Sequence, residues 1–400
     1  MSVINKLNGK RILIWGYGRE GKSTENFLNN HCTPASVKVF EGKLEDIAVE
    51  NSDYIIKRPG IPALHLGEQF LSQTKLFLEE FSGQVIGITG TKGKSTTSTM
   101  LYETLKACLD RPVLLVGNIG LPCLDYYDEI TEDTVIVFEL SCHQLADCTI
   151  SPHIGVFLNL YEEHLDYYKE MAEYYKAKCN VAANQTPSDV AYIGEQVPPF
   201  ETKGRRVIIS SDEKVNFRLN IPGAHNQYNA EFVRRIAVNE FGCEEEQVKQ
   251  VLSEFTGLPH RLQYIGTVEG VEYYDDSIST IPEATIAAAG SIPRVKTIIL
   301  GGMDRHIEYT GLVAFIRENP DIRFVLAYET GARIYEEAMA PQNCYLVSDL
   351  KEAVTLAKQI TPSGMSCVLS PAAASYGYFK NFEERGERFK EFVQNTKRGN

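Results

Sequence analysis

The stretch from residue 85 to residue 101 holds the side chains of this sequence that are best suited to chemistry. An apolar run from Val85 to Ile88 leads into TGTKGKST, and further small hydroxyl residues follow. This order predicts a strand, a glycine-rich loop and a helix, and such a loop lets backbone N–H groups converge on a phosphate. Lys94 adds a fixed positive charge, and Ser95 can reach a phosphate-bound Mg²⁺. The stretch therefore predicts a nucleoside triphosphate site.

The match to the strict phosphate-loop pattern G-x-x-x-x-G-K-[ST] is partial. That pattern requires glycine at the position where Ile88 stands. The alternative is an ordinary glycine-rich turn between a strand and a helix. The joint occurrence of Gly90, Gly93, Lys94 and Ser95 favours nucleotide binding over this alternative.

Two further polar residues follow buried strands in the same region. Glu139 ends an apolar run from Thr134 to Phe138, and His164 follows another run from Gly155 to Leu158. The carboxyl ends of parallel strands meet at one edge of a sheet, so these side chains should approach the nucleotide. A carboxylate there is a candidate Mg²⁺ ligand. The alternatives are a helix-capping or ion-paired role for Glu139 and a structural role for His164.

A second glycine pattern lies near the start of the chain. Gly16, Gly18 and Gly21 follow a short apolar strand, and a second strand from Val37 to Phe40 ends at Glu41. This spacing is typical of dinucleotide-binding folds, in which the acidic residue binds a ribose. The pattern is equally compatible with a tight turn that binds a sugar nucleotide or nothing at all.

Apolar runs that alternate with helical patterns predict an α/β protein of three stacked domains. We place these domains at residues 1–82, 83–261 and 262–400. The expected strands after the phosphate loop are Val113–Val116, Thr134–Phe138, Gly155–Leu158, Gln263–Val268, Val271–Asp275, Lys296–Leu300, Phe324–Ala327, Tyr345–Val347 and Ser366–Leu369. The expected helices include Met171–Ala183, Leu350–Lys358 and Phe382–Val393, whereas residues 198–206 should form a loop. Glu269 and Gly270 predict a hairpin turn.

The composition narrows the class of protein. Four hundred residues exceed what a single hydrophobic core serves, and 43% hydrophobic with 23% charged residues are ordinary values for a globular protein. A net charge of −13 argues against nucleic acid and anionic membranes as partners. The nine cysteines are scattered without paired spacing, which predicts free thiols. Without a long apolar run or a signal-peptide pattern, we expect a cytoplasmic protein with no membrane insertion.

Motifs along almost the whole chain jointly resemble the Mur ligase family, the ATP-dependent amino-acid ligases of peptidoglycan precursor synthesis. The motifs are GYGREG, KRPGIP, TGTKGKST, GNIG, FELSCHQL, EEHLD, YKAKCNV, GAHNQYNA, GLPHR, YDDSIST, LGGMDR and LSPAAASYGYFKNFEERGERF. The resemblance implies a Rossmann-like UDP-binding domain first, a central ATPase-like domain with a parallel sheet and a phosphate loop, and a dinucleotide-fold-like domain last. It also implies a monomer that uses ATP and Mg²⁺ to join glutamate to UDP-N-acetylmuramoyl-L-alanine through an acyl phosphate.

The resemblance assigns roles in phosphoryl transfer by position. It implies Lys94, His164 and Lys178 as catalytic residues. Metal ligands would be Ser95, Glu139, His164 and, once carbamylated, Lys178. An unmodified lysine has no lone pair for a metal, whereas its carbamate is a carboxylate. The alternative is an unmodified Lys178 that neutralises phosphate charge directly. The implied ATP contacts are Gly90, Thr91, Gly93, Lys94, Ser95, Thr96, Asn226, Asn229, Arg261 and Asp276.

The resemblance also assigns the two other substrates. The UDP-linked substrate would contact Gly16, Gly18, Asn118 and Gln144. The incoming glutamate would contact Thr280, Arg305, Ser375 and Phe382, of which the arginine can bind a carboxylate with two parallel hydrogen bonds. An aromatic residue at the position of Phe382 is also compatible with a core role.

Several positions depart from the family pattern. Lys92 stands in place of asparagine, Ile278 in place of lysine, and Cys142 with His143 in place of a serine–aromatic pair. The acidic-Thr-Arg cluster of the first domain is replaced by residues 41–43, EGK, which leaves the uracil contacts open. The loss of a charge at Ile278 leaves the choice between D-glutamate, L-glutamate and another amino acid open.

Three alternatives to a glutamate ligase follow. The first is another ligase of the same superfamily, such as a different Mur ligase or a folylpolyglutamate synthetase. The second is a non-catalytic sugar-nucleotide-binding protein, and the third is an NAD oxidoreductase.

Overall fold

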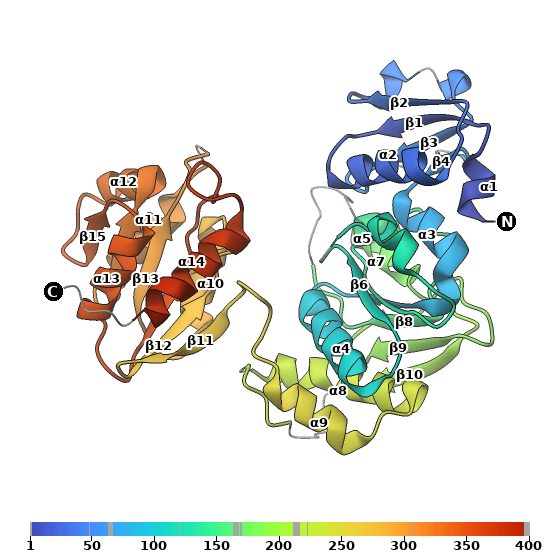
Figure 1. The fold of residues 1–400 in the computed structure, drawn as a ribbon. Coiled ribbons are helices and arrows are strands. Elements are labelled where there is room, and N and C mark those ends of the chain that lie inside the picture. The colour runs from blue at the N-terminus through green and yellow to red at the C-terminus, as the bar shows by residue number, and fades with distance from the viewer. Residues whose placement is uncertain are drawn as a thin grey trace. The chain divides into compact units, whose positions relative to one another are not determined.

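The computed structural model describes residues 2–47, 49–62, 67–119, 121–162, 168, 170–210, 217–221, 223–305 and 307–395. The chain divides into two compact units, residues 1–255 and 256–400, and contains three sheets (Figure 1). The first unit holds two of these sheets and the second unit holds the third. The predicted α/β fold class is confirmed, whereas the domain boundaries at residues 82 and 261 stay predictions.

The first sheet is parallel, with the strand order β2-β1-β3-β4. Its apolar strand β1 pairs on both sides and precedes the turn with Gly16 and Gly18, after which α2 begins at Arg19. The elements of this part are α1 Val3–Leu7, β1 Arg11–Trp15, α2 Arg19–His31, β2 Ser36–Phe40, η1 Leu44–Asp46, η2 Val49–Asn51, β3 Tyr54–Lys57, β4 Phe70–Leu71, α3 Gln73–Phe81 and η3 Ser82–Gln84.

The second sheet is also parallel, with the order β10-β9-β8-β5-β7-β6. Its elements are β5 Val85–Thr89, α4 Lys94–Cys108, β6 Val113–Gly117, η4 Cys123–Glu129, β7 Val135–Glu139, α5 Cys142–Leu145, β8 Ile154–Phe157, α7 Met171–Cys179, β9 Val190–Gly194, β10 Arg205–Ile209, α8 Ala224–Phe241 and α9 Glu245–Glu254.

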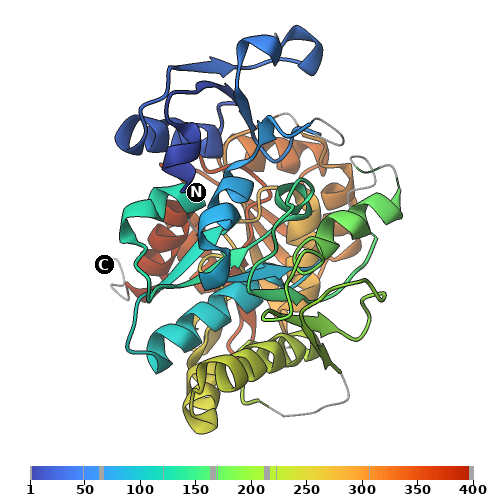
Figure 2. The same cartoon turned by 90° about the vertical axis from the view of Figure 1, so that its right-hand side faces the viewer.

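Helices cover both faces of the second sheet, which explains why its central strands are continuously apolar. Every residue of β5, β7, β8 and β9 is buried. Helices α4, α8 and α9 share one hydrophobic cluster with these strands, and α4 lies beside α8 and α9 in both ribbon views (Figures 1 and 2). Side chains of α3, α5 and α7 belong to another cluster of the first unit. The carboxyl ends of these strands therefore stay at one edge of a rigid layer.

Polar side chains join the first and second sheets within the first unit. The ammonium of Lys57, at the end of β3, lies 2.5 Å from a carboxylate oxygen of Asp147 and donates to the carbonyl of Ile61 at 3.0 Å. Gln144, in α5, donates to Glu20, in α2, at 3.1 Å. Because Lys57 is only 3% exposed, this charge depends on its partners, and the junction holds α2 against α5.

The third sheet has the order β11-β12-β16-β13-β14-β15, with β11 antiparallel and the others parallel. The predicted hairpin at Glu269 and Gly270 is confirmed. The elements are β11 Gln263–Val268, β12 Val271–Asp275, α10 Pro282–Ser291, β13 Val295–Gly301, α11 Thr310–Glu318, β14 Arg323–Ala327, α12 Tyr328–Glu337, β15 Cys344–Val347, α13 Leu350–Ile360, β16 Ser366–Leu369 and α14 Phe382–Gln394.

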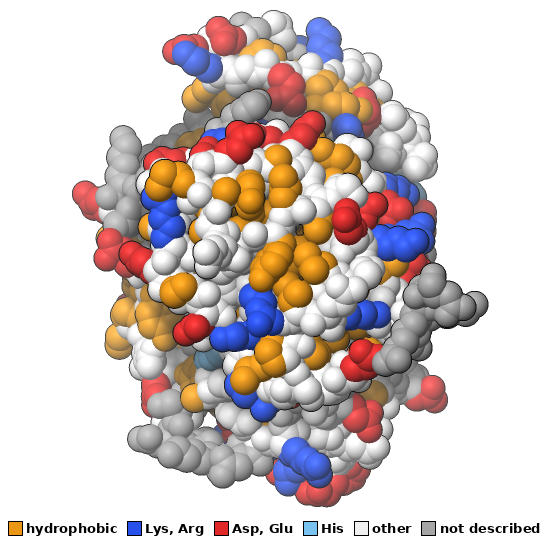
Figure 3. Space-filling model, turned by 90° about the vertical axis from the view of Figure 1, so that its left-hand side faces the viewer, with side chains coloured by type: hydrophobic (Ala, Val, Ile, Leu, Met, Phe, Trp, Pro, Cys, Tyr) orange, Lys and Arg blue, Asp and Glu red, His pale blue; other side chains and the backbone are white. Residues whose placement is uncertain are grey.

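The surface of the second unit mixes apolar and charged side chains. Figure 3 shows one face of it, on which hydrophobic side chains lie between scattered lysines, arginines and acids. Met339 is the most exposed large hydrophobic residue of this unit, at 75%. Among the described residues, no helix is both long and apolar enough to cross a membrane. The nine cysteines are free thiols, as predicted.

Some element predictions need correction. The helix predicted from Met171 to Ala183 ends at Cys179, and the predicted loop 198–206 overlaps β10, which begins at Arg205. Strand β9 and helix α9 were not predicted. Strand β9 is fully buried, and its short apolar run VAYIG follows a polar turn without a distinctive period, so only the neighbouring strands define it.

The tight turn before α2 gives a stability prediction. A Cβ atom on Gly21 would lie 2.3 Å from the carbonyl oxygen of Gly16, and backbone atoms cannot move aside cheaply. Gly21→Ala should therefore lower the free energy of unfolding by about 1–3 kcal/mol. Gly18→Ala is the matched control, because a Cβ there meets nothing within 4 Å. Equal urea-unfolding midpoints for the two variants would contradict the prediction.

Candidate active site

The glycine-rich loop runs from the end of β5 to the start of α4, as the sequence predicts. Gly93 precedes the helix with φ +84°, a conformation that favours glycine. A Cβ atom at this position would lie 2.8 Å from the side-chain oxygen of Asn229. The structure thus brings together two predicted ATP contacts, one from the loop and one from α8. Ser95 and Thr96 lie in the first turn of α4, next to Lys94.

Asn159, which directly follows β8 and Leu158, fixes the backbone of the loop. Its side chain accepts from the backbone N–H of Lys92 at 2.9 Å and donates to the carbonyl of the same residue at 3.0 Å. Its own carbonyl accepts from the N–H of Thr91 at 3.0 Å. Its position directly after an apolar strand is the sequence signal that places Asn159 at this edge of the sheet. Lys92 is exposed, so its substitution does not alter the buried part of the loop.

Two lysines converge on one carbonyl oxygen of the loop. The ammonium of Lys94 donates to the carbonyls of Gly90 and Thr91, each at 3.0 Å. The ammonium of Lys178, from α7, donates to the carbonyl of Gly90 at 2.7 Å. The Lys178 side chain is almost fully buried, at 1% exposed. Two residues that are 84 positions apart, and that the resemblance marks as catalytic, are therefore neighbours in space.

Tyrosines support this pair of lysines. The ammonium of Lys178 lies 4.8 Å from the ring centre of Tyr174, within the range of a cation–π contact. The hydroxyl of Tyr174 lies 3.1 Å from that of Thr91, which also accepts from the backbone N–H of Tyr161 at 2.9 Å. Tyr174 lies four residues before Lys178 in α7, and this helical spacing is the sequence signal that places the two side chains on one face.

Glu139, the last residue of β7, is completely buried. One of its carboxylate oxygens accepts from the side chain of Asn118 at 2.9 Å, and the other is buried without a hydrogen-bond partner. An unsatisfied buried carboxylate oxygen is costly, so it marks a position where a cation or a donor is expected. Asn118, predicted to touch the UDP-linked substrate, is thus held against the predicted metal ligand.

The described residues include only some of the predicted metal ligands. His164 lies outside them, and the described part of the chain contains no cluster of three or more histidines, cysteines, aspartates and glutamates. Ser95 and Glu139 offer hydroxyl and carboxylate oxygens, which are the ligand types that Mg²⁺ prefers. A metal ion bound by these two residues would need further oxygen ligands, such as those of phosphate and water.

A cavity of about 510 Å³ opens beside the loop. Its lining combines loop residues with the first turns of α8 and with the ends of β8 and β9: Lys92, Gly93, Asn159, Tyr161, Gln196, Ala224, His225, Tyr228 and Asn229. The aromatic and amide side chains suit a flat heterocycle with hydrogen-bonding edges. Asn226, the other predicted contact on α8, is buried at 8% exposed and does not line the cavity.

The residues predicted for the UDP-linked substrate lie around α2 and α5. Gly16 has φ +94°, and Gly18 is the residue before α2. Gln144 forms a capping box with Ser141 and donates to Glu20 in the first turn of α2. Burial raises the pKa of Glu20, against the opposing effects of the Gln144 hydrogen bond and nearby cations. Gln144 is thereby oriented toward the turn that carries Gly16 and Gly18.

Two predicted ATP contacts belong to the second unit. Arg261 is exposed, whereas Asp276 is 2% exposed and fully engaged. One carboxylate oxygen of Asp276 accepts from the hydroxyls of Ser279 at 2.6 Å and Ser370 at 2.7 Å, and the other accepts from the N–H of Leu262 at 3.2 Å. Through these bonds Asp276 links the backbone of Leu262 to Ser279 and Ser370, and its contact with ATP stays a prediction.

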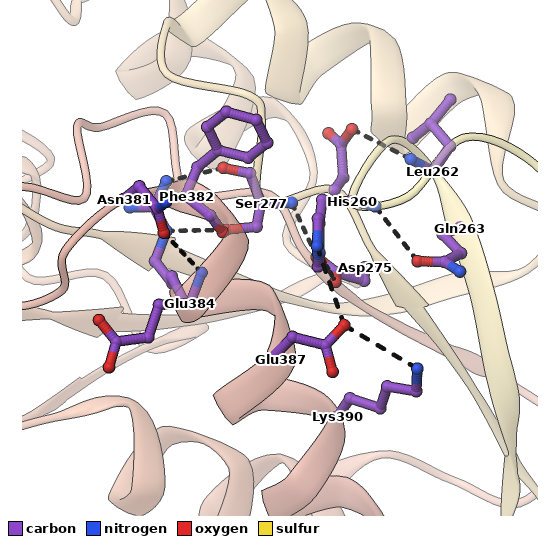
Figure 4. Close-up of polar contacts among 12 residues, drawn as sticks. His260, Leu262, Gln263, Asp275, Ser277, Asn381, Phe382, Glu384, Glu387 and Lys390 are labelled. Atoms are coloured by element: carbon purple, nitrogen blue, oxygen red, sulfur yellow. Dashed lines mark hydrogen bonds and ion pairs between the residues drawn. The ribbon is translucent and has the colours of Figure 1, made fainter. Parts of the chain in front are cut away.

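The residues predicted to hold glutamate are only partly brought together. Arg305 donates to the carbonyl of Thr280 at 3.1 Å, so these two are neighbours. Ser375 is buried, at 3% exposed. The carbonyl of Phe382 accepts from Ser277 at 2.8 Å, and its ring packs edge-on against His260 (Figure 4). Phe382 therefore has a packing role, in line with the core alternative, and its contact with glutamate stays a prediction.

A parallel sheet with a lysine-bearing glycine loop at the start of a helix is the architecture of phosphate-loop nucleotide-binding proteins. Within that class, residues 88–203 match the family model described as the Mur ligase middle domain. The UDP-N-acetylmuramoylalanine–D-glutamate ligase of Aquifex aeolicus is 32% identical over 416 residues, covering 96% of this chain and 98% of that protein. The chain therefore belongs to the Mur ligase family, which confirms the resemblance that the motifs predicted.

Two other similarities are informative. The UDP-N-acetylmuramoyl-L-alanine–L-glutamate ligase of Salinispora tropica is 31% identical, covering 98% of this chain and 99% of that protein. The crystal structure of the MurF ligase from Thermotoga maritima in complex with ADP superposes with a TM-score of 0.55 at 16% identity, covering 97% of this chain and 96% of that one. This last similarity supports the fold.

The Asp276 carboxyl yields a pH prediction. Burial raises its pKa to about 6 from 3.8, despite the opposing hydrogen bonds from Ser279 and Ser370. Between these values the folded state binds the proton more tightly than the unfolded chain, so stability falls as pH rises, by about 1.4 kcal/mol per pKa unit. The thermal midpoint of the wild type should therefore fall relative to that of Asp276→Asn between about pH 4 and about pH 7. A pH-independent difference between the two midpoints would contradict this assignment.

Proposed function

We propose that this protein is an ATP-dependent ligase that joins glutamate, in its D form, to UDP-N-acetylmuramoyl-L-alanine. The observation that carries the proposal is the convergence of Lys94 and Lys178 on Gly90, with the unsatisfied carboxylate of Glu139 at the neighbouring strand end. The relatives named for this reaction span nearly the whole chain. Free thiols at all nine cysteines accord with a cytoplasmic enzyme, which we take to act as a monomer.

The reaction transfers the γ-phosphoryl group of ATP to the alanyl carboxylate of the UDP-linked substrate and releases ADP. The amine of glutamate then attacks the carbonyl carbon of this acyl phosphate and loses a proton. The bond between that carbon and the bridging oxygen breaks, and phosphate leaves with the oxygen and the bonding electron pair. In the first step negative charge spreads over the transferring phosphoryl oxygens. Two fixed ammonium groups, on Lys94 and Lys178, stabilise that charge where it develops.

The backbone of the phosphate loop is held in place by contacts within the protein itself. Asn159 fixes the backbone N–H and the carbonyl of Lys92, and the N-terminus of α4, where helical N–H groups favour an anion, follows directly. The cavity beside Gly93 and Asn229 accommodates the base of the nucleotide. Its volume of about 510 Å³ lies within the range of ligand pockets.

Mg²⁺ fits the oxygen donors of this site. Ser95 and Glu139 would hold it, and the partnerless carboxylate oxygen of Glu139 supports this assignment. When bound, the ion neutralises phosphate charge and orients the phosphoryl group. Within the chain, Asn118 keeps the Glu139 carboxylate in place. The family resemblance implies a metal contact of His164 and carbamylation of Lys178. Carbamylation would replace the ammonium of Lys178 with a carboxylate, so it is the alternative to the charge stabilisation proposed here for that lysine.

The choice of glutamate rests on Arg305 and on the relatives. An exposed guanidinium anchored at Thr280 can bind a carboxylate through two parallel bonds. The names of the relatives include both a D-glutamate and an L-glutamate ligase at similar identity. We propose D-glutamate because most of these relatives carry that name.

The substrate assignment is tested by an amino-acid screen. Purified protein with ATP, Mg²⁺ and UDP-N-acetylmuramoyl-L-alanine should release phosphate when D-glutamate is added, and release it more slowly with L-glutamate or other amino acids. Preference for L-glutamate would correct the stereochemistry. A requirement for a different amino acid, or for a folate in place of the UDP-linked substrate, would overturn the proposal.

Removal of the loop lysine tests its role in phosphoryl transfer. Lys94→Met should lower kcat on the order of a hundredfold or more, since one stabilising charge is lost from the transition state. Lys106→Met is the matched control, because Lys106 is exposed in the last turn of the same helix and donates to the hydroxyl of Tyr102 at 3.2 Å. Phosphate release by Lys94→Met at the control rate would contradict the assignment.

The metal assignment is tested by titration with Mg²⁺. Glu139→Gln keeps the shape of the side chain but lacks its charge, so the Mg²⁺ concentration for half-maximal activity should rise about tenfold. Glu132→Gln is the control, because Glu132 is exposed on the surface of the same unit. An unchanged Mg²⁺ dependence in Glu139→Gln would remove this residue from the metal site.

A further inference from the structure

The segment after β8 brings an aromatic side chain to the cavity beside the phosphate loop. Tyr161 follows Asn159 and Leu160 and lines this cavity. Its backbone is bonded to the loop, because its N–H donates to the hydroxyl of Thr91 at 2.9 Å and its carbonyl accepts from the same hydroxyl at 3.2 Å. The backbone position of Tyr161 is therefore set by the loop and does not depend on the tyrosine side chain.

The side chain of Tyr161 is also held at its far end. Its hydroxyl donates to the side-chain oxygen of Gln196, which follows β9, at 2.9 Å. Between these two anchors the residue is still 49% exposed, although it lines the cavity. A tyrosine ring that is anchored at both ends and left open to solvent presents an apolar face of fixed orientation to a ligand.

Tyr228, near the start of α8, is a second fixed aromatic group of the same cavity. Its hydroxyl donates to the carbonyl of Ile209 at 2.9 Å and accepts from the N–H of Glu195 at 3.3 Å. Burial raises the pKa of this hydroxyl to about 12, so it stays neutral. A Cβ atom on Gly194 would lie 2.8 Å from the Tyr228 hydroxyl oxygen and 2.1 Å from the carbonyl oxygen of Leu158, so only glycine fits there.

Gln196 retains donors for a ligand. Its side-chain oxygen accepts from Tyr161, and its side-chain amide nitrogen has no hydrogen-bond partner among the residues that the structure describes. Among the described residues that line the cavity, Lys92 is the only lysine, arginine or acid. A nearly uncharged cavity with an aromatic face and a free amide suits a nucleobase, which has a flat face and ring nitrogens that accept hydrogen bonds.

We propose that Tyr161 and Gln196 recognise the base of the nucleotide: adenine stacks on the ring of Tyr161, and the side-chain amide of Gln196 donates to one of its ring nitrogens. The assignment deepens the proposed function and rests on one premise of it, that ATP binds at the phosphate loop. The loop and the lysines hold the phosphates, whereas Tyr161 and Gln196 contact only the base.

The test compares a nucleotide with a ligand that lacks a base. Titration calorimetry on the full chain measures binding of ADP and of inorganic tripolyphosphate, each with Mg²⁺. Tyr161→Ala removes the stacking surface and should weaken ADP binding about tenfold or more. Its affinity for tripolyphosphate should stay within about twofold of the wild type, because the backbone bonds to Thr91 are retained.

Two conservative variants separate stacking from hydrogen bonding. Tyr161→Phe keeps the ring and loses only the bond to Gln196, so its ADP affinity should stay within about threefold of the wild type. Gln196→Leu removes the donor to the base and should weaken ADP binding about fivefold.

Tyr102→Ala is the matched control for the loss of a tyrosine ring. Tyr102 lies on α4 and does not line the cavity, and its hydroxyl accepts from Lys106 at 3.2 Å. The affinity of this variant for ADP should equal that of the wild type.

Each outcome decides the assignment. Wild-type ADP affinity in Tyr161→Ala, equal weakening in the alanine and phenylalanine variants, or equal losses of ADP and tripolyphosphate affinity would overturn the stacking role. Wild-type ADP affinity in Gln196→Leu would overturn the hydrogen bond to the base. A wild-type protein that binds ADP but releases no phosphate with any amino acid would overturn the proposed ligase reaction alone. A wild-type protein that does not bind ADP would overturn both.

Discussion

Two lysine ammonium groups, one from α4 and one from α7, share a single carbonyl oxygen of the phosphate loop. Lys94 and Lys178 both donate to Gly90, and like charges held so close repel each other unless an anion lies near them. Because Lys178 is buried, its charge is weakly screened by solvent. A phosphate group can accept hydrogen bonds from both ammonium groups at once. The loop therefore has to keep a fixed conformation. The side chain of Asn159 stabilises that conformation through its hydrogen bonds to the backbone N–H and carbonyl of Lys92.

The parallel sheet explains how distant residues reach this point. Strands β5, β7 and β8 are neighbours, and their carboxyl ends deliver the loop, Glu139 and Asn159 to one edge. Helices on both faces bury those strands, so the strand ends hold the site residues in fixed positions. In the second unit, a buried hydrogen bond between His260 and Asp275 lies next to the exposed Arg261.

Local pattern was enough to predict the loop and most of the elements. The glycines, Lys94 and Ser95 lie within a few residues of one another, and the hairpin from β11 to β12 has its predicted bounds. Contacts made through the fold were not predictable in this way. Tyr174 and Asn159 act on the loop from other strands and helices, and Gly386 meets His260 across more than a hundred residues of chain. The family resemblance supplied Lys178, and His164 lies outside the described residues.

In the proposed reaction, ATP transfers a phosphoryl group to a carboxylate, and the charges clustered around Gly90 stabilise this transfer. Isotope transfer tests this most directly: the alanyl carboxylate of UDP-N-acetylmuramoyl-L-alanine is labelled with ¹⁸O, and the phosphate released during ligation is analysed by mass spectrometry. If an acyl phosphate forms, the oxygen that joins carbon to phosphorus leaves with the phosphate, so each phosphate carries one ¹⁸O atom from a fully labelled carboxylate. Unlabelled phosphate, formed together with the ligated product, would contradict the account.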